Sequence, residues 1–272
     1  NLLLLEGKPA EAEPYFIKSM KADPSHALAI NNLGVSVLQQ GRISEAMDFF
    51  QRATSENPGL VDPLKNLAEL MLAMGKNRSA GEYAVTGLKL DPDDPRLLLV
   101  LAKVYERADM PDRQEKVWNT MVNATDGSLD ARLGLATFYL KEGVYGLAES
   151  KLKTILAERP DFPEAQLQMG RLLALTGKTA ESRRELSRLL DAHPAYGAAR
   201  TSLAHLALEA GDFDEALNVA RQGAESSPDD PESWFVLGVC HEKKEDYDQA
   251  EEAYKKVLSI DFRHARALNN LG

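Results

Sequence analysis

The feature that most constrains this chain is a period of 34 residues that runs through the whole sequence. A large apolar residue recurs at that spacing without insertion or deletion, and a glycine or alanine always follows it. The apolar column is Leu33, Leu67, Leu101, Leu135, Met169, Leu203, Leu237 and Leu271, and the small column is Gly34, Ala68, Ala102, Ala136, Gly170, Ala204, Gly238 and Gly272. A period of this length indicates short structural units that stack on their neighbours and share a core.

Residues 27–60 show what one unit contains. An apolar stripe at helical spacing over residues 30–37 predicts a first helix, and Gly41 supplies the left-handed residue that ends it. A second stripe over residues 43–53 predicts a second helix. Pro58 ends this helix, because the residue before a proline is pushed out of the α region. Each unit is therefore predicted to be an antiparallel helix pair.

The motif positions of these units resemble those of the tetratricopeptide repeat family. They are Trp234, Leu237, Gly238, Tyr247, Ala250 and Tyr254 in one unit, and Leu33, Gly34, Gly41, Ala46, Phe50 and Pro58 in another. The resemblance covers the whole chain and implies an all-α, right-handed superhelical solenoid of antiparallel helix pairs. We expect one solenoid over residues 1–272, belonging to a longer protein. Its expected parts are a partial unit 1–26, full units 27–60, 61–94, 95–128, 129–162, 163–196, 197–230 and 231–264, and a partial unit 265–272.

One unit departs from the motif. Residues 95–128 carry Asp109 in place of the turn glycine, Gln114 in place of the small alanine and Asp126 in place of the closing proline. The unit 231–264 also lacks the turn glycine and the proline. Two interpretations remain open, namely drift within a tolerant repeat and a softer joint where the curvature changes.

Composition and motifs exclude several classes of function. The net charge of −10 argues against binding to a phosphate backbone, and no apolar run approaches a membrane helix. No pattern typical of a catalytic, nucleotide or metal site stands out, so we expect no enzyme activity, no cofactor and no metal. The single cysteine, Cys240, is expected in the core. Three of the five histidines, His26, His193 and His264, are expected in turns between units.

A binding site in such an array is expected on the concave face, which first helices line in tetratricopeptide relatives. The polar candidates on that face are Asn31, Asn32, Lys65, Asn66 and Gln168. An asparagine amide both donates and accepts hydrogen bonds, so Asn32 and Asn66 are predicted to clamp the backbone of an extended peptide. This column resembles the asparagine ladder of the repeats of O-linked N-acetylglucosamine transferase.

The middle of the groove is predicted to be apolar and basic. Leu99, Leu133 and Leu167 form the predicted floor, and the basic residues beside it are Arg96, Lys103, Arg107, Lys141 and Arg171. Two alternatives stand beside this prediction: neighbouring side chains cover the leucines, and Glu106, Asp130 and Glu164 pair with the cations. Glu69 stands where the chaperone-tail clamp of the family has an asparagine, so that specificity is not expected.

The sequence thus favours a non-catalytic protein-interaction scaffold that binds an extended or helical peptide. One alternative is the substrate-docking array of a larger enzyme such as a glycosyltransferase. Another is a spacer in an envelope polysaccharide-export or pilus assembly. The expected partner is a protein or peptide, with no nucleic acid and no membrane insertion. Head-to-tail self-association through the two chain ends is a further hypothesis. The compartment stays open, with the cytoplasm weighted slightly above the periplasm.

Overall fold

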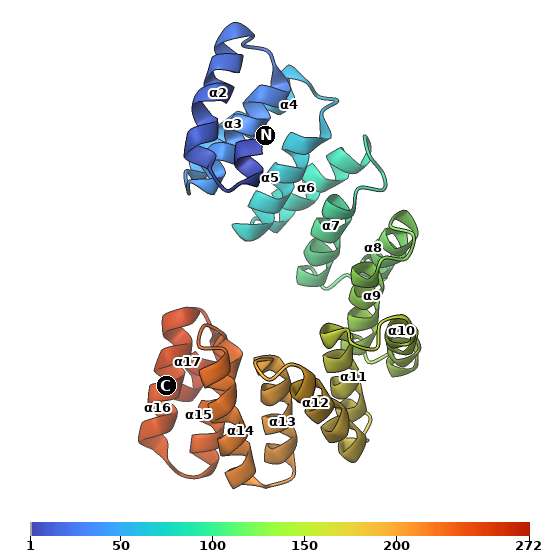
Figure 1. The fold of residues 1–272 in the computed structure, drawn as a ribbon, viewed down its shortest axis with the longest axis vertical. Coiled ribbons are helices and arrows are strands. Elements are labelled where there is room, and N and C mark those ends of the chain that lie inside the picture. Colours follow the sequence, from blue (N-terminus) through green and yellow to red (C-terminus); the bar gives the residue numbers. More distant parts are fainter. Residues whose placement is uncertain (1) are drawn as a thin grey trace. The chain divides into compact units, whose positions relative to one another are not determined.

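The computed structural model describes residues 2–272, in which every regular element is an α-helix (Figure 1). The predicted all-α fold of stacked antiparallel helix pairs is confirmed. The helices are α1 (Leu2–Leu5), α2 (Pro9–Ala22), α3 (Ala27–Gln39), α4 (Ile43–Glu56), α5 (Val61–Ala73), α6 (Asn77–Leu88), α7 (Pro95–Arg107), α8 (Pro111–Ala124), α9 (Leu129–Lys141), α10 (Tyr145–Glu158), α11 (Pro163–Leu175), α12 (Thr179–Ala192), α13 (Gly197–Glu209), α14 (Phe213–Ser226), α15 (Pro231–Lys243), α16 (Tyr247–Ile260) and α17 (Ala265–Leu271).

The helices group into two compact units that divide the chain within α9. The first unit ends at Leu135 and the second begins at Ala136. In each unit the first helix of a repeat packs against the second helix of the same repeat and against the next repeat. First helices of neighbouring repeats also contact each other, as α5 contacts α7 and α13 contacts α15, whereas second helices make no comparable contacts among the described pairs. The first helices therefore line the inner face of each unit.

The turns between paired helices keep one backbone conformation even where the sequence changes. Gly41 has the expected left-handed φ of 79°. Asp109 and Glu245, which replace the glycine, adopt φ values of 53° and 62°. A side chain with a Cβ costs free energy in that region, so packing of the two helices imposes the turn on both residues.

The paired helices approach closely because their contact positions are small. A Cβ on Gly34 would lie 2.6 Å from the ring of Phe50, which is fully buried. A Cβ on Gly170 would lie 2.6 Å from a methyl group of Leu186. The column of large residues on the second helix thus fills the space that the small column leaves on the first.

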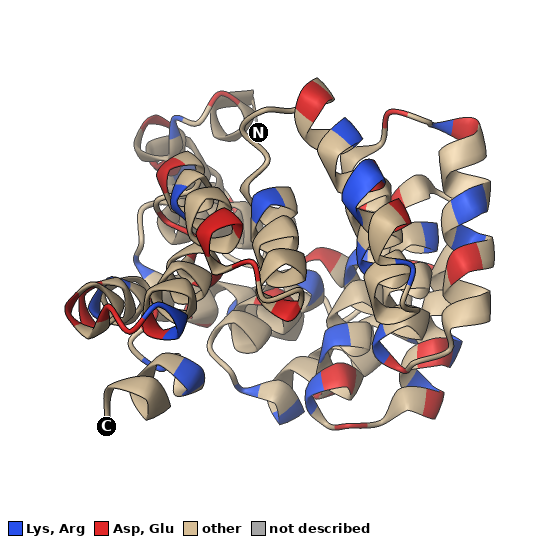
Figure 2. Cartoon of the chain, turned by 90° about the horizontal axis from the view of Figure 1, so that it is seen from below, with Lys and Arg blue, Asp and Glu red and all other residues tan. Residues whose placement is uncertain are grey.

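The remaining expectations concern polar residues and charge. Cys240 is fully buried, which confirms its predicted place in the core, and burial raises the pKa of its thiol to about 12. His26 and His264 precede helices and His193 follows one, as expected. Acidic and basic residues are interspersed along the helices (Figure 2). No helix among residues 2–272 is long and apolar enough to cross a membrane.

Candidate functional site on the inner faces of the two units

The predicted asparagine clamp lies on the inner face of the first unit, where its amides bind one another. Asn66 Nδ2 donates to Asn31 Oδ1 at 3.0 Å, and Asn31, which is 3% exposed, donates to Asn32 Oδ1 at 3.4 Å. Arg96 Nη2 donates to Asn66 Oδ1 at 3.2 Å. A chain of hydrogen bonds therefore links α3, α5 and α7, and the side-chain carbonyls of Asn31 and Asn66 accept bonds from within it.

The cations of this row have carboxylate partners. Lys65 lies 2.8 Å from Asp62 and 3.1 Å from Asp94. Burial alone would lower the pKa of Lys65, but these two carboxylates raise it above its ordinary value. Arg96 pairs with Glu69 at 2.6 Å, and the hydrogen bond raises the pKa of Arg96. Glu69 is thus the partner of the guanidinium, in place of the acidic residues considered from the sequence.

The other candidates in the first unit differ in how accessible they are. Arg107 Nη1 donates to the carbonyl of Leu72 at 3.0 Å and to Asn77 Oδ1 at 2.9 Å. Its guanidinium therefore connects α7 to α5 and α6. Lys103 is exposed and makes no ion pair with a described residue. Leu99 is 38% exposed, and Leu133 is half-buried.

The three leucines do not share one environment, which corrects the prediction of a uniform apolar floor. Leu167 is only 5% exposed, because it belongs to a core cluster with Leu186, Leu189 and Leu206. Leu99 and Leu167 occupy the same position of the repeat. This position faces the neighbouring repeat at α11 and faces solvent at α7. The alternative that neighbours cover the leucines therefore holds for Leu167, and Leu99 alone stands exposed.

The second unit carries a pocket of about 640 Å³ on its inner face, and three of the predicted residues line it. Lys141, Gln168 and Arg171 belong to α9 and α11 and contribute polar groups to its wall. Its apolar lining includes Leu140, Ala174, Leu175, Leu186 and Leu206. Pockets of this size, mostly apolar with a few polar groups that converge, are typical of ligand sites.

A leucine lines the pocket at the position where another repeat has a tyrosine. In the last full repeat, the Tyr254 hydroxyl donates to Glu242 Oε2 at 2.7 Å and accepts from Asn270 Nδ2 at 2.9 Å. Tyr254 thereby reaches from its own second helix to the inner face of the next repeat. The residues that occupy these three positions in the repeat 163–196 and its neighbour all line the pocket, and they are Ala174, Leu186 and Ser202.

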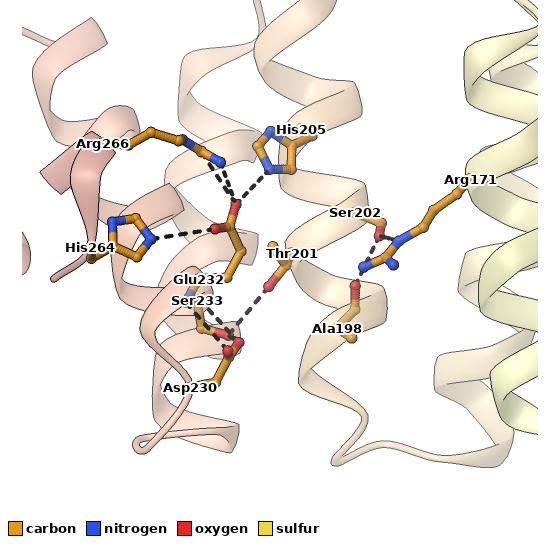
Figure 3. A network of polar contacts seen from close by, with 10 residues as sticks. All are labelled: Arg171, Ala198, Thr201, Ser202, His205, Asp230, Glu232, Ser233, His264 and Arg266. Carbon is orange, nitrogen blue, oxygen red and sulfur yellow. Dashed lines mark hydrogen bonds and ion pairs between the residues drawn. The ribbon is translucent and has the colours of Figure 1, made fainter. Parts of the chain in front are cut away.

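A network of polar contacts forms one side of the pocket (Figure 3). Glu232 lies at its centre, with oxygens 3.7 Å from His205 Nε2, 3.9 Å from His264 Nε2 and 3.3 Å from Arg266 Nη2. Burial would raise the pKa of Glu232, but the hydrogen bond to His205 and the charge of Arg266 outweigh burial and lower it. The ionised form of Glu232 is therefore favoured, and it already has Arg266 as a cationic neighbour.

Arg171 faces the same network from α11 (Figure 3). Its Nε donates to Ser202 Oγ at 3.4 Å, and Ser202 Oγ donates to the carbonyl of Ala198 at 2.9 Å. Arg171 is exposed as a whole residue, yet the protein atoms around its guanidinium desolvate it, and this burial lowers the pKa of Arg171. No carboxylate of residues 2–272 lies within ion-pair distance of it.

Sequence reasoning missed Leu186, Ser202, His205 and Glu232 as pocket residues. The first two occupy positions that meet at this junction in other repeats, namely the residue on the second helix and the residue 16 positions later. Tyr254 meets Asn270, and Trp118 lies against Gly134, where an added Cβ would be 2.2 Å from the indole. At the same junction Leu186 and Ser202 both line the pocket. No described group of His, Cys, Asp and Glu side chains is arranged to hold a metal ion.

The arrangement of helix pairs is the fold of a tetratricopeptide repeat array. Two tetratricopeptide repeat models match the sequence, one over residues 1–60 and 201–265 and the other over residues 37–104 and 139–206. The chain belongs to the tetratricopeptide repeat family.

Among known proteins, the chain is similar to the BBSome complex member BBS4 of Bos taurus, with 24% identity over 86% of this chain and 45% of that protein. It is also similar to the cellulose synthase 1 operon protein C of Komagataeibacter xylinus, with 22% identity over 91% of this chain and 17% of that protein. The chain thus spans less than half the length of either relative. A tetratricopeptide repeat protein from Parabacteroides merdae shares the fold, with a TM-score of 0.72 and 18% identity over 88% of this chain and 94% of that one.

Proposed function

We propose that this chain is a non-catalytic interaction segment that binds a peptide of another protein, in extended form, in the pocket on the inner face of its second unit. The single observation that carries the proposal is the pocket itself, about 640 Å³ in volume, with an apolar floor and polar groups on its rim. Its walls are helices, so the site is formed before a ligand arrives and ordering costs little.

The first unit takes a secondary role in this proposal. Its amide row is engaged within the chain, so a peptide would meet few free acceptors there. Leu99 is 38% exposed there, and Lys103 is exposed and makes no ion pair with a described residue. A peptide in extended conformation that fills the pocket can continue along the later first helices of the second unit, because the stacked repeats of that unit present the same face again.

The relatives support a protein as the ligand class. BBS4 is by name a member of a complex, and a protein that assembles with others needs surfaces of this kind. The partners of BBS4 are not carried over, because the chain spans only 45% of that protein. The proposal names a mode of binding and leaves the partner to experiment.

Filling the pocket from its floor tests the proposal. The Leu186→Tyr variant places a phenol ring where Tyr254 has one in its own repeat, with Gly170 beneath it as Gly238 lies beneath Tyr254. We expect the variant to fold and to lose at least about tenfold in affinity for peptides selected on the natural chain, a difference of about 1.4 kcal/mol. Fluorescence anisotropy with those peptides measures the loss, and circular dichroism checks the fold.

A matched control keeps the chemistry and moves it away from the pocket. Leu147 is 45% exposed on α10 and does not line the pocket, so Leu147→Tyr should bind the same peptides as the natural chain does. Undiminished binding by Leu186→Tyr would contradict the proposal. Separately, Asn32→Ala should weaken peptides that bind the inner face of the first unit by itself, and an unchanged affinity would contradict the amide clamp.

A second candidate function is favoured by one observation. The Komagataeibacter relative is named for a cellulose synthase operon, which agrees with a spacer or docking array in an envelope polysaccharide assembly. Under this candidate the pocket would hold a segment of the assembly. Fractionation of the source cells tests it: recovery of the parent protein with the envelope supports it, and recovery in the cytoplasm contradicts it.

A further inference from the structure

Arg171 is a cation at the pocket wall that no carboxylate neutralises. Two other arginines of the second unit have an acidic partner on a neighbouring repeat: Arg183 pairs with Glu215, and Arg266 lies 3.3 Å from Glu232. Arg171 has only the hydroxyl of Ser202, at 3.4 Å. A guanidinium has five N–H donors arranged to meet a carboxylate, so most of the donors of Arg171 are left for a ligand or for water.

The acidic residues of the pocket do not fill this role. Glu232 is already surrounded by His205, His264 and Arg266. Glu209 is the other carboxylate of the lining, and it stands four residues beyond His205 on α13, about 6 Å further along the helix axis. The repeat places His205 level with Arg171, so Glu209 lies one turn away as well as on the neighbouring helix.

The apolar part of the pocket lies next to Arg171. Leu175 is on the same helix, one turn further on, and is 58% exposed. Leu140 and Leu206 are largely buried and flank it from the neighbouring first helices. An anionic group bound at Arg171 thus lies beside apolar surface. An apolar side chain of the same ligand would cover this surface, whereas an inorganic anion would leave it exposed.

We propose that the pocket selects peptides by an internal acidic residue, whose carboxylate takes the free donors of Arg171 while an adjacent apolar side chain covers Leu175. The inference rests on the proposed function and deepens it. An unpaired, partly desolvated cation is costly to the free protein, so a ligand carboxylate gains both the attraction and the relief of that cost. Because the lining extends to first helices on both sides of Arg171, the carboxylate belongs to a residue within the peptide and not to its end.

The test uses an array of random dodecapeptides that are acetylated and amidated at their ends, so that side chains carry every charge. The full chain is compared with Arg171→Glu and with Arg171→Gln, which preserves size without charge. We expect bound sequences to be enriched in Asp or Glu beside an apolar residue. Replacing that Glu by Gln in a bound peptide should weaken binding to the natural chain about tenfold and to Arg171→Gln less than about twofold.

Charge reversal and a matched control sharpen the result. Arg171→Glu should shift the enrichment from acidic to basic residues. Arg221 is exposed on α14 and makes no ion pair with any residue of 2–272, so Arg221→Glu makes the same change in net charge outside the pocket and should select the same peptides as the natural chain.

The failures of the two proposals are distinguishable. Suppose that the selected peptides no longer bind Leu186→Tyr but show no enrichment in acidic residues. This result would overturn the inference and leave the proposed function standing. The same holds if replacing Glu by Gln in the peptide reduces affinity for Arg171→Gln as much as for the natural chain. Binding that appears only when the peptides carry a free terminal carboxylate would also overturn it. An array in which no peptide prefers the natural chain to Leu186→Tyr would overturn both.

Discussion

Two repeats of the second unit use the same junction in opposite ways. In the repeat 231–264, Tyr254 is 2% exposed and its hydroxyl is held by Glu242 and Asn270, so the space between consecutive repeats is filled. In the repeat 163–196, Leu186 stands in the place of the tyrosine, and the space opens into the pocket. The same position on the second helix thus carries a residue that fills the junction in one repeat and a residue that lines the pocket in the other.

The first unit shows a third arrangement of the same junction. Trp118 is larger than tyrosine, and the residue it meets in the next repeat is Gly134. The size of one residue is thus balanced by the size of the other, as close packing requires. At the junction of Leu186 with Ser202 both residues are of modest size, and both line the pocket.

The largest effect is expected from emptying the filled junction. Tyr254→Ala removes a buried ring and two hydrogen bonds, which should cost about 3–5 kcal/mol of unfolding free energy, as for other large aromatic truncations. Urea unfolding followed by circular dichroism measures it. Tyr247 in the same repeat is 65% exposed, and Tyr247→Ala should change stability by less than about 0.5 kcal/mol. Equal unfolding midpoints for the two variants would contradict the filled junction.

A smaller loss is expected from overfilling the junction of the first unit. The Cβ of Gly134→Ala would lie 2.2 Å from the Trp118 ring, so the indole must move, at a cost of about 1–3 kcal/mol. The change in tryptophan emission on unfolding reports the shift. A Cβ added to Gly81 on α6 would lie 3.5 Å from a methyl group of Val104, which is an ordinary contact. Gly81→Ala is therefore the control and should be neutral or stabilising. If Gly134→Ala were as stable as Gly81→Ala, the packing of Trp118 would be wrong.

The two repeats also differ at the turn between their helices. Glu245 adopts φ 62° where the pocket repeat has Gly177 at φ 75°. Glu245→Gly should therefore stabilise the chain by about 1 kcal/mol, and Gly177→Glu should destabilise it by a similar amount. Thermal unfolding measured at one scan rate compares the pair. A loss of stability in Glu245→Gly would show that the glutamate side chain contributes more than its backbone costs.

The smallest effect concerns pH. The lowered pKa of Glu232 means that its ionised form is favoured in the folded state, so its contribution is complete above the unfolded value of about 4.3 and is lost as the pH falls below it. Glu232→Gln removes the carboxyl group that titrates. The unfolding free energy of this variant should therefore decline less steeply with falling pH in that acidic window. The control is Glu225→Gln, because Glu225 is exposed and forms no ion pair within the part of the chain that the structure describes. Identical acid transitions for the two variants would contradict the network around Glu232.

Much of the fold could be predicted from the columns of the repeat, and part of the site could not. The columns place Gly41 in a left-handed turn and Leu33 in the core, and both outcomes are observed. The same columns place Asn66 on the inner face, but they do not reveal that its amide binds Asn31. Leu99 and Leu167 occupy equivalent positions, and one is exposed while the other is buried.

The sequence by itself determined the helix pairs and the residues that form their shared core, because helical spacing and left-handed turns are local properties that each unit repeats. The tertiary structure decided which polar groups are used up within the chain and where space remains. Those outcomes depend on the sizes and rotamers of side chains from several helices that meet at a junction, such as Ala174, Leu186 and Ser202. The residues at a single position of the repeat do not determine how these side chains pack together. The pocket and the absence of an ion pair at Arg171 therefore follow only from the stacking of the repeats.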